Sequence, residues 1–446
     1  MSRHYLIKTE MNLFKSILGT FTLLLLSAST IFGQTFTPAR SQDKPIAIAN
    51  ATIHVGDGTI IEKGIVYFEK GKIISVVEGG SENVDINKYK LIDAEKKHLY
   101  PGLILPISTL GLVEIEAVKA SRDNYERGAF NPNIRSIIAY NTDSELIGTL
   151  RYNGILLAQI TPSGGTGMAG TTSIVQLDAW NWEDAIYQQD DALVMGWPRR
   201  FFGPRWWLGE SEMRPNPNYD KQVREIKKAF EDAAAYSKST PETVNIKLEA
   251  MKGLFDGSKT LIINPGSIKN VVSSVQTVQS LGVKRIVVVG NSELLMVKEF
   301  LKENNISVIL EDIHGLPERE GDNINLPYKL PALLKKEGIK FCFGYFSSVA
   351  SSRNLPFFAG TATAYGLSKE EALQAMTKDA ADILGIGNRT GMIKTGLDAN
   401  IIVSEGDILD MKTNHLTHAF IQGRQLELTN KQVKLYEKYK KKYNQK

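Results

Sequence analysis

The sequence predicts an α/β fold built on a parallel sheet or a barrel. Short apolar, β-rich runs recur through the middle of the chain, and runs with helical periodicity follow most of them. This alternation is typical of parallel sheets and barrels. The length of 446 residues also fits, because it suffices for one (β/α)8 barrel with a small added domain, or for about two to three average domains.

Each central element has a local signal. The clearest helix is expected at 219–236, where Val223, Ile226, Phe230 and Ala233 fall on one face at three- and four-residue spacing. A second helix is expected at 293–302. Buried strands are expected at 154–160, 173–177, 260–263, 285–289, 307–310 and 340–343.

Both chain ends carry β signals. Residues 46–55 read as a strand, and 65–68 with 73–77 read as a hairpin. Near the other end, strands are expected at 401–403 and 419–422. Before them, Ser368 and Glu371 have the spacing of a capping box, so a helix is expected to begin there and to continue through 380–385.

The segment Tyr100-Pro-Gly-Leu-Ile-Leu-Pro-Ile-Ser-Thr109 resembles the point where an amidohydrolase chain enters its barrel. Residues 49–73 and 391–403 are similar to the two ends of imidazolonepropionase-like amidohydrolases, and the resemblance covers about 46–425. It implies an α/β fold in which a (β/α)8 TIM-like barrel spans 100–390. It also implies a small composite β-sandwich domain formed by 46–99 and 391–428, which leaves 429–446 as a basic C-terminal tail.

The same resemblance locates a metal site. In the family, two histidines follow the first barrel strand, and further ligands follow later strands. Here the corresponding places are held by Ile107, Thr109, Asn264, Gly290 and Phe346, none of which offers an imidazole or a carboxylate. No cofactor or metal is therefore predicted. A divalent metal such as zinc is expected only if the family site is retained in an altered form.

A second group of polar residues follows the expected strand at 307–310. Glu311, Asp312 and His314 would lie at the carboxyl ends of the barrel strands, where such barrels place their chemistry. They are the candidate catalytic residues, as metal ligands or as acid–base groups. The alternative is that they cap the loop and bond to backbone.

Two loops are candidates for the rim of a binding cleft. Residues 161–170 are rich in glycine but lack the spacing of a Walker or dinucleotide motif. Their backbone amides could hold an anion, or the loop could simply be tight. The aromatic stretch 197–207 has no periodicity and is expected to form a long loop over the barrel mouth.

Three functions remain open. The chain could be a hydrolase acting on carbon–nitrogen bonds other than peptide bonds, as the family implies, with an altered site. It could be a catalytically silent relative that binds a small-molecule ligand. It could also be a subunit, either of a homo-oligomer or of a heteromer with a metal-bearing homologue.

The remaining features concern location and partners. Lys15, the apolar run 17–26 and the small residues after it predict a signal peptide over 1–33, and therefore export to a periplasmic or extracellular location. No cysteine ends that run, so a lipoprotein is not expected. The only cysteine, Cys342, lies in an apolar run and is expected to be a buried strand residue. A net charge of +4 is too small to indicate a nucleic-acid partner.

Overall fold

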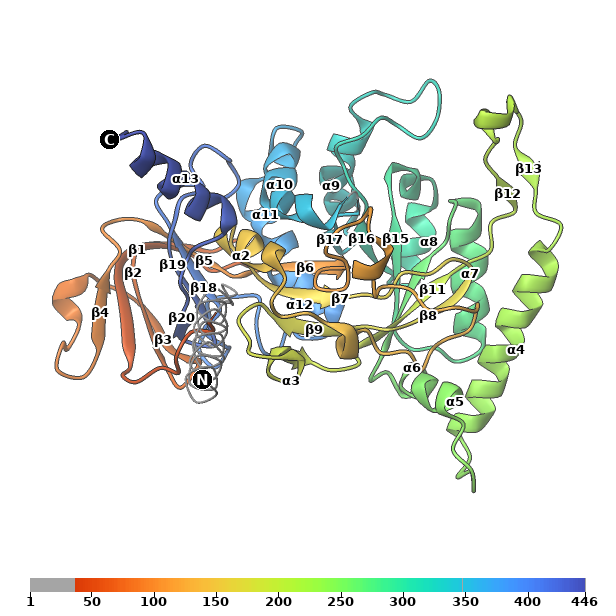
Figure 1. Cartoon of the computed structure of the whole chain (residues 1–446), viewed down its shortest axis with the longest axis horizontal. Helices are drawn as coiled ribbons and strands as arrows, with labels where there is room; N and C mark the ends of the chain where they lie inside the picture. The colour runs from red at the N-terminus through yellow and green to blue at the C-terminus, as the bar shows by residue number, and fades with distance from the viewer. Residues whose placement is uncertain (1–36, 347, 446) are drawn as a thin grey trace, which may run out of the picture. The chain divides into compact units, whose positions relative to one another are not determined.

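The computed structural model describes residues 37–346 and 348–445, and the expected signal peptide lies outside them. Residues from Pro38 onward form one compact unit. It contains three larger sheets, a two-stranded hairpin and the helices shown in Figure 1. Within the described ranges, no helix has the length and hydropathy of a transmembrane segment.

The two ends of the chain share one eight-stranded sheet. Its strands follow the order β20-β19-β18-β5-β1-β2-β3, with β4 paired to β1. The strands from the N-terminal side are β1 (Ile46–His54), β2 (Ile60–Glu69), β3 (Lys72–Glu78), β4 (Lys90–Asp93) and β5 (His98–Pro101). Those from the C-terminal side are β18 (Ile401–Ser404), β19 (Leu416–Ile421) and β20 (Arg424–Gln425). The antiparallel pairing of β18 with β5 joins the ends.

This sheet curls so that distant strands face each other. The ring of Phe68 on β2 lies 5.2 Å from the ring of Phe420 on β19, although three strands separate β2 and β19 along the sheet. The edge strand β3 also contacts the C-terminal part of the chain, because the amide of Ile73 on β3 donates to the carbonyl of Leu397 at 2.9 Å. One curled sheet therefore supplies the layered packing that a sandwich requires.

The α/β region has two hydrogen-bonded sheets. One contains β6 (Leu103–Ser108), β7 (Ile155–Ile160), β9 (Ser173–Gln176) and β10 (Ile186–Gln188). The other contains β8 (Gly167–Thr171), β11 (Ala192–Gly196), β14 (Thr260–Asn264), β15 (Ile286–Gly290), β16 (Ser307–Leu310) and β17 (Phe341–Phe343). The last five pair in parallel, in the order β11-β14-β15-β16-β17, as expected of βαβ units.

Helices connect and cover these strands. Those before β14 are α2 (Glu145–Tyr152), α3 (Trp182–Ala185), α4 (Tyr219–Ser237), α5 (Ile246–Met251) and α6 (Gly253–Asp256). Those after it are α7 (Lys269–Ser280), α8 (Lys298–Glu303), α9 (Leu326–Glu337), α10 (Leu355–Thr363), α11 (Lys369–Met376), α12 (Lys378–Leu384) and α13 (Lys431–Lys442). The helix expected at 219–236 is α4, and it buries Ile226, Phe230 and Ala233 as its periodicity predicted.

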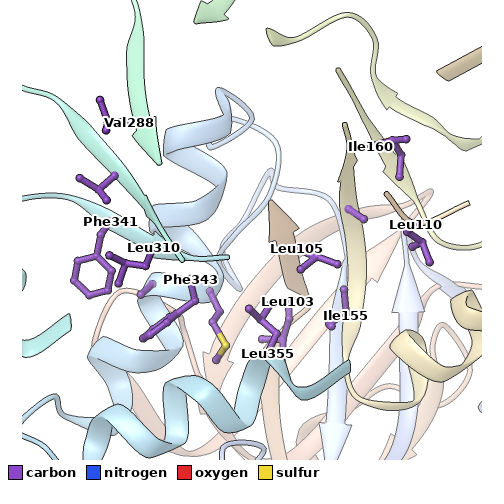
Figure 2. Close-up of a cluster of buried hydrophobic side chains, with 14 of the residues drawn as sticks. Leu103, Leu105, Leu110, Ile155, Ile160, Val288, Leu310, Phe341, Phe343 and Leu355 are labelled. Carbon is purple, nitrogen blue, oxygen red and sulfur yellow. The ribbon is translucent and has the colours of Figure 1, made fainter. Parts of the chain in front are cut away.

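Strand residues alternate between two cores. Alternate residues such as Ile104, Leu157, Ile262 and Ile309 meet in one interior cluster drawn from both sheets. Their neighbours point outward into a larger core with the helices, which Figure 2 shows around Leu103, Leu310 and Leu355. Because strand side chains alternate with a period of two, the two sheets must wrap around the shared interior.

The wrapped strands do not form the closed ladder expected of a (β/α)8 barrel. Within the described residues, no strand of one sheet is hydrogen-bonded as a neighbour to a strand of the other. The ladder is interrupted at two places, between the edge strands β6 and β17, and at Thr172, where the chain leaves β8 in one sheet and enters β9 in the other. Both strands run antiparallel to their partners, so an antiparallel insertion replaces one βα unit of the regular pattern.

Candidate functional site

A cleft opens at the carboxyl ends of the strands of the α/β region. Its volume is about 540 Å³, and its walls come from segments that follow β6, β7, β11, β14 and β17. A second cavity of about 350 Å³ adjoins it at the ends of β14, β15 and β16. The two cavities share Arg199, Asn264 and Gly266. In a wrapped parallel sheet this end is where ligands bind.

The five places that the resemblance assigned to metal ligands all reach this region. Ile107, Thr109, Asn264 and Phe346 line the larger cavity, and Gly290 lines the smaller one beside Asn264. All five places therefore lie at strand ends that border these two cavities.

The backbone at Ile107 is unusual. Its φ is +46°, in the left-handed region, which a β-branched side chain rarely adopts. The amide of Ile107 donates to Oε1 of Gln159 at 3.3 Å, and Nε2 of Gln159 donates to Oδ2 of Asp191 at 2.6 Å. Strained backbone of this kind concentrates at functional sites, since the surrounding structure must hold it in place. Here it lies at a cleft wall with a polar network beneath it.

Asp191 is the centre of that buried network. Thr172 Oγ1 also donates to it, at 2.7 Å from Oδ1. Burial raises the pKa of Asp191 to about 6, and the hydrogen bonds from Thr172 and Gln159 limit the rise. The carboxyl does not line either cavity, and it reaches the cleft wall only indirectly, through the hydrogen bonds between Asp191 and Gln159 and between Gln159 and Ile107.

The donor set does not fit the family's divalent metal. The charged side chains lining the two cavities are Arg199, Glu293, Glu311 and Glu318. Throughout residues 37–346 and 348–445, no three His, Cys, Asp or Glu side chains are grouped so that they could hold a metal ion. An ion with one or two carboxylates and no imidazole would lack the tetrahedral set that zinc takes in proteins.

The second predicted group is divided by the structure. Glu311 lines the smaller cavity, where burial, and then the charges of Glu318 and Asp312, raise its pKa. Asp312 accepts a hydrogen bond from the amide of Phe346, at 2.8 Å. His314 points to α10. Glu311 is thus the one member that reaches either cavity.

His314 is held outside the cleft by its neighbours on α10. Its Nε2 lies 2.8 Å from Oγ1 of Thr361, and its ring lies 4.1 Å from the ring of Phe358. Burial lowers the pKa of His314. Of the three predicted residues, Asp312 thus bonds to a backbone amide, whereas His314 contacts side chains of α10.

Both expected rim loops reach the cleft. Residues 161–166 of the glycine-rich loop form one wall. This wall is tight, since a Cβ on Gly196 would lie 2.0 Å from the carbonyl oxygen of Gly165. From the aromatic stretch, Trp197, Arg199 and Phe202 also line the cleft. The sequence missed Arg199 as a site residue, although its place in that stretch was an available signal.

Comparison with known proteins identifies the family. Residues 208–429 match the family model described as "Amidohydrolase family". The chain belongs to the amidohydrolase superfamily. No curated protein matches it significantly.

Solved structures of amidohydrolases share its fold. An amidohydrolase from Thermotoga maritima MSB8 superposes with a TM-score of 0.74 at 21% identity, covering 86% of this chain and 99% of its own. A prolidase complexed with N-methylphosphonate-L-proline gives 0.53 at 14% identity, with 86% and 100% covered. A putative prolidase from Bifidobacterium longum gives 0.52 at 15% identity, with 89% and 99% covered.

Proposed function

We propose that this amidohydrolase-family protein binds a small anionic molecule in its cleft and lacks the metal-dependent hydrolysis typical of the family. The observation that carries the proposal is the chemistry of the five family ligand places. They line the cleft and the adjoining smaller cavity, yet they hold Ile107, Thr109, Asn264, Gly290 and Phe346, which supply no imidazole and no carboxylate. Water activation by a bound metal requires those ligands.

The cleft instead has the features of a binding site for a carboxylate. Arg199 lies where the two cavities meet. Its guanidinium can bind a carboxylate through two parallel hydrogen bonds. Thr109, Ser163 and Asn264 line the same space, and their side chains are of the kinds that bind a neutral amide or hydroxyl. The ligand class is therefore a small carboxylate with a polar body.

Calorimetric titration with N-acetyl amino acids, including N-acetyl-L-proline, tests this proposal. Arg199→Gln should weaken binding at least about tenfold, because a charge-assisted pair is lost. Arg224→Gln, on the exposed side of α4, is the matched control and should bind like the wild type. Metal analysis of the same preparation should find well under one divalent ion per chain. A stoichiometric metal, or unchanged affinity in Arg199→Gln, would contradict the proposal.

One observation favours a second candidate. Glu311 is a carboxyl of the smaller cavity whose pKa is raised, and such groups serve as general acids or bases. We therefore keep as an alternative a metal-independent hydrolase of carbon–nitrogen bonds other than peptide bonds. If Glu311 is the base, turnover of an amide panel should rise as pH rises through its raised pKa, and Glu311→Gln should abolish it. Glu299→Gln, outside the cleft, should leave turnover unchanged.

A further inference from the structure

The hairpin formed by residues 199–216 carries an unusual set of exposed side chains. Strands β12 (Phe201–Phe202) and β13 (Arg214–Pro215) pair in antiparallel fashion, and a short 3-10 turn, Trp206–Leu208, lies between them. Figure 1 shows this hairpin extending away from α4. Its apolar side chains are largely exposed: Phe201 50%, Phe202 39%, Trp206 78%, Trp207 64%, Leu208 61% and Met213 58%.

Contacts within the hairpin hold this tip in shape. The guanidinium of Arg205 pairs with Glu210, and Arg214 Nε lies 3.2 Å from the same carboxylate. The hydrogen bond from Arg205 lowers the pKa of Glu210 to about 2, so the Glu210 carboxylate stays charged at neutral pH. The rings of Trp206 and Trp207 meet edge to face, with centroids 5.8 Å apart. The exposed aromatic groups are thus presented by a structured turn.

Charge and residue type together indicate the partner. Between 199 and 214 the hairpin has four arginines, Arg199, Arg200, Arg205 and Arg214, against two glutamates, Glu210 and Glu212. Tryptophan favours the headgroup region of a bilayer, where its ring is buried and its N–H stays hydrated. Arginines beside it are attracted to anionic headgroups. A symmetric contact with a second copy would instead bring the arginines of both hairpins together, which is unfavourable.

We propose that the 199–216 hairpin docks on an anionic lipid surface by inserting Trp206, Trp207 and Leu208 into the headgroup region. The contact is interfacial, since the tip is only one turn deep. Phe202 and Arg199 link the hairpin base to the larger cavity, so the docked protein would present its cleft close to the lipid.

Vesicle sedimentation tests the proposal. The full-length gene product is purified, the N-terminus of every variant is determined, and only preparations with the same start are compared. The wild type should sediment with vesicles of phosphatidylglycerol and phosphatidylethanolamine, and much less with phosphatidylcholine or at high salt. Trp206→Ser/Trp207→Ser should lower the partition coefficient at least about tenfold. The matched control, Trp180→Ser, removes a tryptophan that is 66% exposed elsewhere and should behave like the wild type.

A second measurement reads the hairpin directly. Vesicles with brominated acyl chains should quench wild-type tryptophan fluorescence, and this quenching should disappear in the double variant but persist in Trp180→Ser. Leu208→Ser/Met213→Ser provides an independent pair that should also weaken sedimentation. The proposal is overturned if the wild type does not bind the anionic vesicles, or if the double variant binds as well as the wild type. It is also overturned if the hairpin substitutions only dissociate a dimer in light scattering.

Discussion

The buried carboxyl of Asp191 makes the free energy of unfolding depend on pH. Burial raises its pKa from 3.8 to about 6, so between these values the folded chain holds a proton that the unfolded chain has released. Rising pH therefore removes stability over that window, and the loss is complete above about pH 6.

Replacing Asp191 by Asn should abolish this dependence. From about pH 4 to pH 7 the wild type should lose roughly 3 kcal/mol relative to Asp191→Asn, because one pKa unit corresponds to about 1.4 kcal/mol. Urea unfolding of both proteins across the window measures the difference. Asp220→Asn, an exposed aspartate on α4, should stay parallel to the wild type. A constant gap between wild type and Asp191→Asn would show that the carboxyl is not protonated in the folded state.

For single residues, the sequence indicated which positions follow the strands, but it did not indicate their backbone conformation or their side-chain contacts. The family resemblance pointed to Ile107 and Asn264, and both line the cleft. Nothing in the sequence signals that Ile107 has a φ of +46°, since isoleucine disfavours that conformation. The separation of Glu311 from His314 was also inaccessible, because the contact of His314 with Thr361 joins residues 47 positions apart.

Helix α11 begins with the capping box that its sequence predicted. Oγ of Ser368 accepts from the amide of Glu371 at 3.2 Å, and Oε2 of Glu371 accepts from the amide of Ser368 at 3.0 Å. Ser368→Ala should cost about 1 kcal/mol, measured as a shift in the urea midpoint. Asn218→Ala is the matched control, because Asn218 precedes α4 without a side-chain cap bond, and its effect should be clearly smaller. Equal losses at both sites would remove the capping explanation.

Element types were predictable and some element boundaries were not. The expected continuous helix after Ser368 breaks at Thr377, whose Oγ1 donates to the carbonyl of Leu373 at 2.8 Å. A threonine that bonds to the preceding turn can interrupt a helix. The helix expected at 293–302 likewise begins as a 3-10 segment, Ser292–Val297. The stretch 197–207 was expected to be a loop, and strand β12 within it was not predicted, because strands of two residues leave no periodicity to detect.

Asp398 joins the curled sheet to the α/β region. It is 4% exposed, accepts from the hydroxyl of Tyr187 at 2.5 Å and lies 2.6 Å from Nζ of Lys72. Asp398→Ala should lower stability by about 3 kcal/mol, since the buried hydroxyl of Tyr187 loses its acceptor and two cations, Lys72 and Arg389, lose their counterion. Thermal unfolding measures the loss.

Lys72→Met is the control for this link. Its side chain is 51% exposed, so its removal should cost less than about 1 kcal/mol. If Asp398→Ala were no more destabilising than Lys72→Met, the buried contact with Tyr187 would not be holding the two regions together.

At the scale of the whole molecule, the pairing of the chain ends was predictable through resemblance alone. Neither 46–55 nor 401–403 specifies a partner by composition, and β5 pairs with β18 across some 300 residues of sequence. The missing closure of the barrel was not predictable, because strand periodicity fixes which face is buried and not which neighbour is bonded. Assembly with itself or with a metal-bearing homologue stays a prediction.

Cys342 is the only cysteine in the chain, and it is fully buried among the interior strand residues. Burial raises the pKa of its thiol well above the usual range, so it forms almost no thiolate. A cysteine placed at Leu208 would consequently be the one thiol that a maleimide dye modifies. The protein can therefore be labelled at one chosen site with a fluorescent or spin probe, without first replacing Cys342.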